Sequence, residues 1–213
     1  RSGKLLSNFK IKSKLLPYHK FNERKMSGKI VNLIKKRKII SLISDAGTPT
    51  ISDPGMIIVN ECIKENLKIC PIPGPSASIS AFSVSGFDDQ YLFYGFLTKK
   101  ESKLENILKN LSILDYSIIF FISAQKINFY ISKFKKYFAN REILIAKEMT
   151  KIHEEFIRGK IETIKIFSTP PKGELTVVLS RKKEKKNFKN NINESVKIEI
   201  KNMLKKYSHK DVV

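Results

Sequence analysis

Several features that would assign this chain to other classes of protein are missing from its sequence. It has no tryptophan and only two cysteines, and neither cysteine has a Cys or His neighbour at zinc-ligand spacing. We therefore expect no metal, and we expect Cys62 and Cys70 to be buried thiols in a reducing compartment. No apolar run reaches the length of about 18 residues needed for a transmembrane helix, and the first residues show no signal-peptide pattern. These absences predict a cytoplasmic protein without a membrane partner.

Acidic residues are also scarce, and they are distributed unevenly along the chain. The chain has 41 basic and 20 acidic residues and a formal net charge of +21. Residues 1–44 carry 13 basic groups and one acidic group, whereas residues 45–97 carry two and six. This distribution favours a polyanionic partner such as nucleic acid around an acidic segment suited to a cationic ligand. Compositional drift towards Lys, Ile and Asn is the alternative explanation of the total charge.

The hydrophobic pattern predicts an α/β chain. In the N-terminal half, helices are expected near 2–9 and over 22–36, the second capped by Asn22. Two apolar runs, Ile39–Ile43 and Lys68–Ile72, are predicted to be buried parallel strands, each followed by a loop and a helix. Asp53 and Pro54 are expected to cap the first of these helices.

The C-terminal half predicts a second group of strands and helices. Strands are expected over 91–96, 116–122, 142–146, 154–157 and 174–179, and helices over 101–111, 125–138 and 162–167. A Lys/Asn-rich linker (181–191) and a helix over 193–207 follow, and Ser208 could cap a further helix. We therefore predict a parallel-sheet N-terminal α/β domain (1–89), a mixed-sheet C-terminal α/β domain (90–180), and a basic linker with a helical tail (181–213).

Two stiff loops lie at the carboxyl ends of the two predicted parallel strands. Ser44–Gly55 contains a glycine and a proline soon after its strand and closes with Pro-Gly, and Pro73–Ser76 places two prolines around a glycine. Ligands of parallel α/β sheets bind at such strand ends. Neither loop has the spacing of a phosphate-binding loop. From the residues alone, an ordinary strand-to-helix turn explains each loop equally well.

A resemblance to the tetrapyrrole methylase superfamily decides between these explanations. Within it, the chain resembles the small-subunit ribosomal RNA methyltransferase I group. The resemblance rests on five stretches: Ser44–Gly55, Pro71–Ala77, Tyr94–Leu97, Lys147–Lys151 and Lys172–Glu174. It implies two α/β domains with S-adenosylmethionine in the cleft between them, and a homodimer. It also implies methyl transfer to the ribose 2′-hydroxyl of a cytidine in the 16S rRNA of the small ribosomal subunit.

The resemblance also implies roles for particular residues. The residues expected to hold the cofactor are Asp45, Ala46, Gly47, Thr48, Asp53, Pro75, Ser76, Ala77, Gly173 and Glu174. Asp45 and Glu148 are the candidate general bases for the hydroxyl. RNA contacts are expected at Arg1, Lys4, His19 and Lys147. The competing explanation for His19, Asn22 and Glu23 is a helix-capping asparagine beside two surface side chains. For Lys147 and its neighbours, the competing explanation is a solvated rim at the end of a strand.

The chain also departs from the family pattern. The usual first strand, with its P-T-P-I-G-N-L loop and the acidic pair before Arg1, is not in this sequence, and Ile122 occupies an acidic position. We therefore expect a fragment with an incomplete cofactor cleft. Two alternative functions stay open: a methylase of a tetrapyrrole or other small molecule, and a non-catalytic RNA-binding or ribosome-assembly protein.

Overall fold

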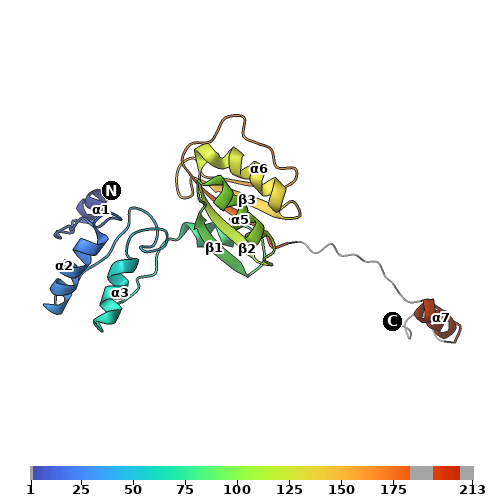
Figure 1. Ribbon diagram of the computed structural model, residues 1–213, viewed down its shortest axis with the longest axis horizontal. Coiled ribbons are helices and arrows are strands. Elements are labelled where there is room, and N and C mark those ends of the chain that lie inside the picture. Colours follow the sequence, from blue (N-terminus) through green and yellow to red (C-terminus); the bar gives the residue numbers. More distant parts are fainter. Residues whose placement is uncertain (1, 183–193, 207–213) are drawn as a thin grey trace. The chain divides into compact units, whose positions relative to one another are not determined.

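A mixed five-stranded sheet is the centre of the structure, a computed structural model that describes residues 2–182 and 194–206. Its strands run in the order β1-β2-β5-β3-β4, and β1–β2 is the parallel pair while the other three pairs are antiparallel. Figure 1 labels β1, β2 and β3 of this sheet. The strands are β1 (Tyr91–Phe96), β2 (Ser117–Ser123), β3 (Glu142–Lys147), β4 (Glu155–Lys160) and β5 (Glu174–Leu179). All five predicted strands of this half are confirmed, as is the expectation of a mixed sheet.

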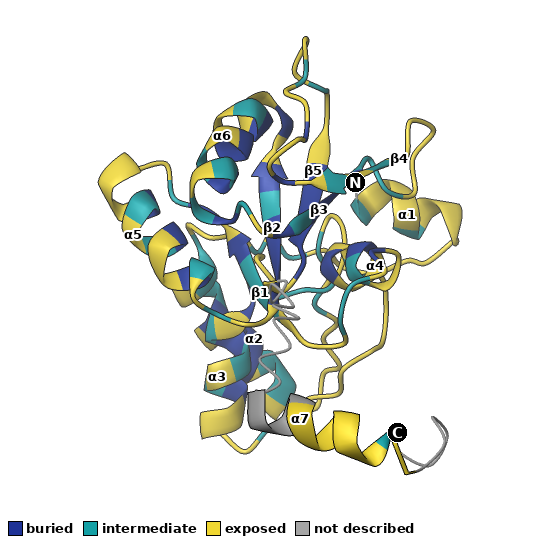
Figure 2. Cartoon of the chain, turned by 90° about the vertical axis from the view of Figure 1, so that its right-hand side faces the viewer, coloured by how far each residue is buried: buried dark blue, intermediate teal, exposed yellow. Residues whose placement is uncertain are grey.

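The sheet is covered on both faces, which explains why its central strands are apolar throughout. Alternate residues of β2 face opposite sides: Phe120 belongs to the core under α5 (Glu101–Ser112) and α6 (Ile127–Tyr137), a helix preceded by the short turn η1 (Ala124–Lys126). Ile119 instead packs with Ala81 of α4 (Ala77–Ser83) on the other face. Figure 2 shows α5 and α6 on one side of the sheet and α4 on the other. A strand buried on both faces reads as a continuous hydrophobic run rather than an alternating one.

One buried charge closes the end of this core. Arg141, 2% exposed, donates through its two terminal nitrogens to the carbonyls of Ser112, Leu114, Tyr116 and Ser180. A guanidinium has five donors and no acceptor, so it can hold several carbonyls from different chain segments together. Arg141 therefore ties the end of α5, the start of β2 and the end of β5 to the start of β3.

Three helices make up the N-terminal part of the chain: α1 (Ser2–Asn8), α2 (Glu23–Lys35) and α3 (Met56–Lys64). Ile30 and Val31 of α2 pack against Ile58 and Cys62 of α3 to form a small separate core. The predicted helices are confirmed here, although α3 begins at Met56 with Gly55 as its N-cap, so the expected cap at Asp53 and Pro54 is wrong. Cys62 is buried as expected, whereas Cys70 is exposed.

The two parallel strands predicted for this part are wrong. In the described part of the chain, neither Ile39–Ile43 nor Lys68–Ile72 forms a strand, and Ile39 and Ile72 are 96% and 83% exposed. An apolar, β-branched run encodes a tendency to be buried, but a strand also needs a neighbour that accepts and donates its backbone hydrogen bonds. The parallel sheet expected for residues 1–89 is therefore not formed.

The helix predicted over 162–167 is also absent. Residues 161–163 form a turn, the residues after it have no regular structure, and Asn128 bonds to Phe167 at the end of the segment. Its amide nitrogen donates to the Phe167 carbonyl at 2.8 Å, and its amide oxygen accepts the Phe167 N–H at 2.9 Å. Because this contact is 39 residues away in sequence, local helix propensity gave no sign of it.

The chain divides into two units, residues 1–182 and 183–213. The second unit contains α7 (Glu194–Met203), which confirms the predicted terminal helix. Most of the linker predicted over 181–191, and the cap predicted at Ser208, lie outside the described residues. Among the described residues, no helix has both the length and the apolar character that a bilayer crossing demands.

Candidate functional site

The Ser44–Gly55 loop has an unusual backbone. The φ angle is positive at Gly47 (74°) and Gly55 (144°), and also at Thr50 (73°) and Ser52 (62°). Residues with side chains rarely adopt such angles, and they cluster at ligand-binding sites where the surrounding structure holds them. The Ser44 hydroxyl helps to fold the loop, since it lies 3.1 Å from the Ala46 carbonyl and 2.9 Å from that of Gly47. The loop is therefore a specific conformation rather than an ordinary turn.

Glu23 anchors the end of this loop. Its Oε1 accepts the backbone N–H of Gly55 at 2.7 Å, at the N-terminus of α3, where a carboxylate also meets the positive end of the helix dipole. A side chain at Gly55 would not fit, because its Cβ would lie 2.6 Å from Thr50 Cγ2 and 2.9 Å from Leu42 Cδ2. Glu23 thus has a structural role that explains its presence without a ligand.

Asn22 also has a local partner. Its Oδ1 accepts the His19 N–H at 2.8 Å and its Nδ2 donates to the Pro17 carbonyl at 3.0 Å. It precedes α2 as predicted, but its side chain does not cap that helix. His19 itself is exposed and lies edge-to-face with Phe21.

The second stiff loop lies against the first. Thr48 Oγ1 donates to the Pro75 carbonyl at 3.1 Å, and a Cβ at Gly47 would stand 3.8 Å from the same oxygen. Ser76 precedes α4 as its N-cap residue, with its hydroxyl 3.1 Å from that of Ser78. The two loops that sequence analysis singled out therefore lie side by side.

The first loop also reaches the sheet. Gly95 interrupts the register of β1 with φ of 79°, and a Cβ there would lie 3.1 Å from Ser52 Oγ. Glycine allows both the irregular backbone and this close approach. Sequence analysis did not name Ser52 or Gly95 as site residues, although both lie within the stretches that carry the resemblance.

A third group surrounds the start of β5. Glu148 Oε1 accepts the Glu174 N–H at 3.0 Å and the Lys151 ammonium at 2.8 Å, while the Glu148 N–H donates to the Glu174 carbonyl at 3.2 Å. Gly173 has φ of 95°, and a Cβ there would overlap the Glu148 carboxylate. Glu148 is therefore bound into the structure on two sides, and sequence analysis missed its partner Lys151.

The electrostatics connect this group to the first loop. Partial burial raises the pKa of Asp53, and the negative charges of Asp45 and Glu174 raise it further. The hydrogen bond from Lys151, followed by the one from the Glu174 N–H, holds the pKa of Glu148 below its usual value. Within the described residues, no group of three or more His, Cys, Asp and Glu side chains is arranged to hold a metal.

The five stretches that carry the resemblance fall into two groups of contacting residues, which an electrostatic interaction connects. Ser44–Gly55 contacts Pro71–Ala77 and Tyr94–Leu97 and interacts electrostatically with Glu174, which in turn is bonded to Lys147–Lys151. The first loop is acidic, with Asp45 and Asp53, and has exposed backbone around Gly47. It suits a cationic ligand of moderate size.

The residues expected to contact RNA are spread more widely. Lys4 lies on α1 and His19 in the loop before α2, both exposed, while Arg1 lies outside the described residues. Lys147, at the end of β3, makes an ion pair with Glu155 at 2.9 Å. Two surface hollows, of about 460 and 520 Å³, are lined by residues 3–15 and 157–169 and not by the stiff loops.

Comparison with known proteins identifies the family. The model of the tetrapyrrole (corrin/porphyrin) methylases matches residues 7–165. A relative from Mesomycoplasma conjunctivae named "Ribosomal RNA small subunit methyltransferase I" is 42% identical over 89% of this chain and 80% of its own length. Another of the same name, from Thermotoga maritima, is 40% identical over 85% of this chain and 83% of its own length. The chain belongs to the tetrapyrrole methylase family.

Solved structures support the same fold. Diphthine synthase matches with a TM-score of 0.59 at 12% identity, over 84% of this chain and 73% of its own. The methyltransferase CobJ matches with a TM-score of 0.55 at 14% identity, over 73% and 70%. At such low identity the likeness concerns the fold alone.

Proposed function

We propose that this protein is an S-adenosylmethionine-dependent methyltransferase that methylates the ribose 2′-hydroxyl of a cytidine in the 16S rRNA of the small ribosomal subunit. The observation that carries the proposal is that the strained, acidic first loop contacts the second stiff loop and β1, and that its Asp53 interacts electrostatically with Glu174 at the start of β5. The names of the relatives support the substrate class. The 2′-hydroxyl and the cytidine come from the resemblance described above.

The residues of this region fit a sulfonium cofactor. The negative charges of Asp45 and Glu174 both act on Asp53, so a cation placed beside Asp53 would relieve that repulsion. The cofactor would be held by residues 45–48 and Asp53 of the first loop, by residues 75–77 of the second, and by Gly173 and Glu174. When bound, it supplies a methyl group already activated by the positive charge on sulfur.

The acceptor hydroxyl must lose its proton as the methyl group is transferred, and the main task of the protein is to align the two. Glu148 is poorly suited to accept that proton, because Lys151 and the Glu174 N–H already occupy it and lower its pKa. Of the two candidate bases, we therefore propose Asp45, which is exposed in the first loop. Glu148 would instead fix the position of Gly173 and Glu174.

The remaining expectations form part of the same proposal. We place the domain boundaries at 1–89, 90–180 and 181–213, with the protein acting as a homodimer in the cytoplasm. Arg1, Lys4, His19 and Lys147 would contact rRNA phosphates or bases. The surplus of positive charge in residues 1–44 supports binding of a polyanion.

A methyl-transfer assay tests the proposal. The full chain would be incubated with methyl-labelled S-adenosylmethionine and, separately, with undermethylated small subunits, free 16S rRNA and a porphyrin. We expect label in the subunits at one cytidine ribose, with a product resistant to alkaline cleavage at that position. Label in the porphyrin alone would favour the small-molecule methylase, and label in none would exclude both enzymes.

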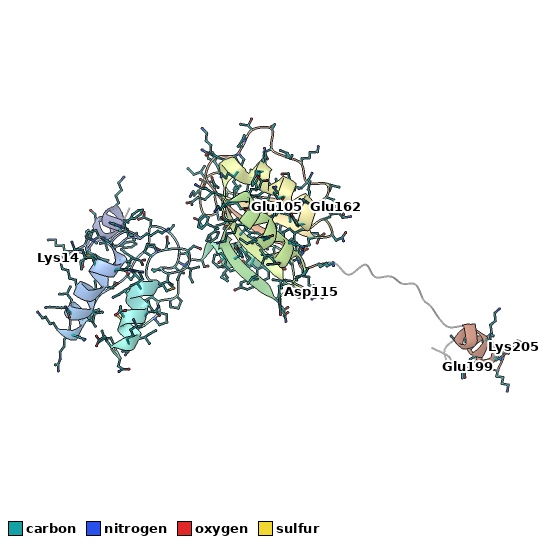
Figure 3. All side chains as sticks on the ribbon, viewed as in Figure 1. Lys14, Glu105, Asp115, Glu162, Glu199 and Lys205 are labelled. Carbon is teal, nitrogen blue, oxygen red and sulfur yellow. The ribbon has the colours of Figure 1, made fainter. Side chains whose placement is uncertain are left out.

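Calorimetry with S-adenosylmethionine tests the site itself. Asp53→Asn should weaken binding of the cofactor, because it removes one of the three negative charges that favour a cation. The matched control is Asp115→Asn, an exposed aspartate far along the chain after α5 that is labelled in Figure 3. Equal affinities of the two variants would contradict the assignment of the acidic region as the cofactor site.

A further inference from the structure

The loop between α1 and α2, residues 9–22, exposes an unusual combination of side chains. Phe21 is 94% exposed and His19 lies edge-to-face with it at 6.2 Å between ring centroids. Lys12, Lys14 and Lys20 are all exposed in the same loop, and Figure 3 shows the Lys14 side chain on the part of the chain that carries α1 and α2. Covering such a ring by a partner would gain hydrophobic free energy.

The charge of this part of the chain is not neutralised locally. Glu23 is the sole acidic residue among residues 1–44, and its carboxylate points inward to the Gly55 N–H. Lys35 makes an ion pair with Glu65 of the α3 C-terminus, at the far end of α2 from this loop. Within residues 2–182, none of Lys12, Lys14 and Lys20 has a recorded ion pair. The loop therefore presents several solvated positive charges.

The shape of the surface adds a third observation. Residues 3–15 line a hollow of about 460 Å³ whose walls include Lys10 and Lys12. Backbone phosphates can follow a hollow edged by ammonium groups, and an exposed aromatic ring in the same loop offers a face for an unstacked base. Duplex RNA has its bases stacked inside and would leave Phe21 without a partner.

We propose that the loop 9–22 is a binding surface for single-stranded RNA, in which Phe21 stacks on a base and Lys12, Lys14 and Lys20 contact phosphates. This inference rests on the proposed function, because it identifies how the rRNA substrate would be recognised outside the methyl-transfer site. Among the residues involved, sequence analysis had named His19 alone. This surface would bind an extended single strand, so it would select the segments of ribosomal RNA that are not base-paired.

The test compares variants of the full chain in fluorescence anisotropy with a labelled single-stranded RNA of about 12 nucleotides, within the site size of single-strand-binding domains. The duplex of the same sequence is the second probe. The variants are Phe21→Ala and the triple Lys12→Gln, Lys14→Gln, Lys20→Gln. The matched control is the triple Lys99→Gln, Lys103→Gln, Lys109→Gln, which removes the same charge from exposed positions before and on α5.

We expect Phe21→Ala to weaken binding of the single strand by roughly five-fold to a hundred-fold, the effect of losing one base–aromatic stack. Binding of the duplex should change by less than two-fold. The loop triple should reduce the slope of log affinity against log salt by about 2, since each phosphate contact on a single strand contributes about 0.7. The control triple should leave that slope within roughly 0.5 of the wild-type value.

Three results would overturn the inference: equal losses in the two lysine triples, unchanged single-strand binding by Phe21→Ala, or an equal loss of duplex binding. A stronger effect of the same variants on binding to phosphatidylglycerol vesicles would identify the loop as a membrane surface instead. Thermal unfolding and S-adenosylmethionine binding of each variant, both expected to be unchanged, separate these outcomes from misfolding. Methyl transfer by the wild-type protein tests the proposed function separately, because RNA could bind this loop even if no methyl group were transferred.

Discussion

The hydrogen bond from Gly55 to Glu23 should stabilise both the fold and the candidate cofactor loop. The bond is 2.7 Å long, partly buried, and made to a carboxylate, which places its contribution at about 1.5–3 kcal/mol. The charge also lies at the N-terminus of α3, which adds roughly 0.3–1 kcal/mol. Glu23→Ala should therefore lower the free energy of unfolding by about 2–4 kcal/mol. For a chain of this size that corresponds to a fall in Tm of roughly 4–16 °C.

Thermal unfolding followed by circular dichroism measures this effect, with calorimetric S-adenosylmethionine binding as a second readout. Glu23→Gln keeps an acceptor oxygen but loses the charge, so its Tm should lie between those of Glu23→Ala and the wild type. The control is Glu65→Ala, which removes the exposed ion pair to Lys35 and should cost no more than about 1 kcal/mol. If Glu23→Ala and Glu65→Ala unfold at the same temperature, the anchoring role assigned to Glu23 is wrong.

Three further predictions concern Gly173 and Glu148 near the start of β5 and the buried Arg141. Gly173→Ala places a Cβ against the Glu148 carboxylate at a φ of 95°, so S-adenosylmethionine affinity should fall at least about ten-fold, a loss of about 1.4 kcal/mol. The control is Gly28→Ala, whose added Cβ meets nothing within 4 Å and which should leave that affinity unchanged. Equal affinities of the two variants in calorimetry would refute the role assigned to Gly173. Glu148→Gln should be less stable than wild type at neutral pH but converge with it in acid. The lowered pKa of Glu148 stabilises the fold above the ordinary carboxyl pKa, and that stability is lost as pH falls through the folded-state value; parallel Tm–pH curves would contradict this. Arg141→Met leaves four backbone carbonyls without their donor, and urea unfolding should show a loss of at least about 3 kcal/mol, whereas a loss below about 1 kcal/mol would refute its role.

The C-terminal half was predictable because each of its strands carries its own signal and finds its partner within the chain. Ser117–Ser123 and Glu174–Leu179 are short, apolar and bounded by turn residues, and they pair with each other. Ile39–Ile43 carries the same signal but has no strand partner among the described residues. Hydrophobicity therefore identified which segments tend to be buried, whereas pairing depends on a second segment that the first does not specify.

The candidate site was predictable to a similar degree. The stiffness of the two loops was visible as Pro and Gly in the sequence, and the structure places the loops together through Thr48 and Pro75. The hydrogen bond between Glu23 and Gly55 joins residues 32 positions apart, and no local sequence pattern predicts it. The same is true of the approach of Ser52 to Gly95, which depends on how the loop meets the sheet.

The strand order of the sheet has a consequence for how the protein is made. Among the described residues β5 is the last strand in sequence, yet it lies in the middle of the sheet and pairs with both β2 and β3. Until residues 174–179 have been synthesised, β1–β2 and β3–β4 are two separate ribbons, each with an unpaired apolar edge. Such edges associate readily with other chains, so a nascent chain is vulnerable for most of its synthesis. A truncation before Glu174 should therefore yield an aggregating product, rather than a smaller folded one.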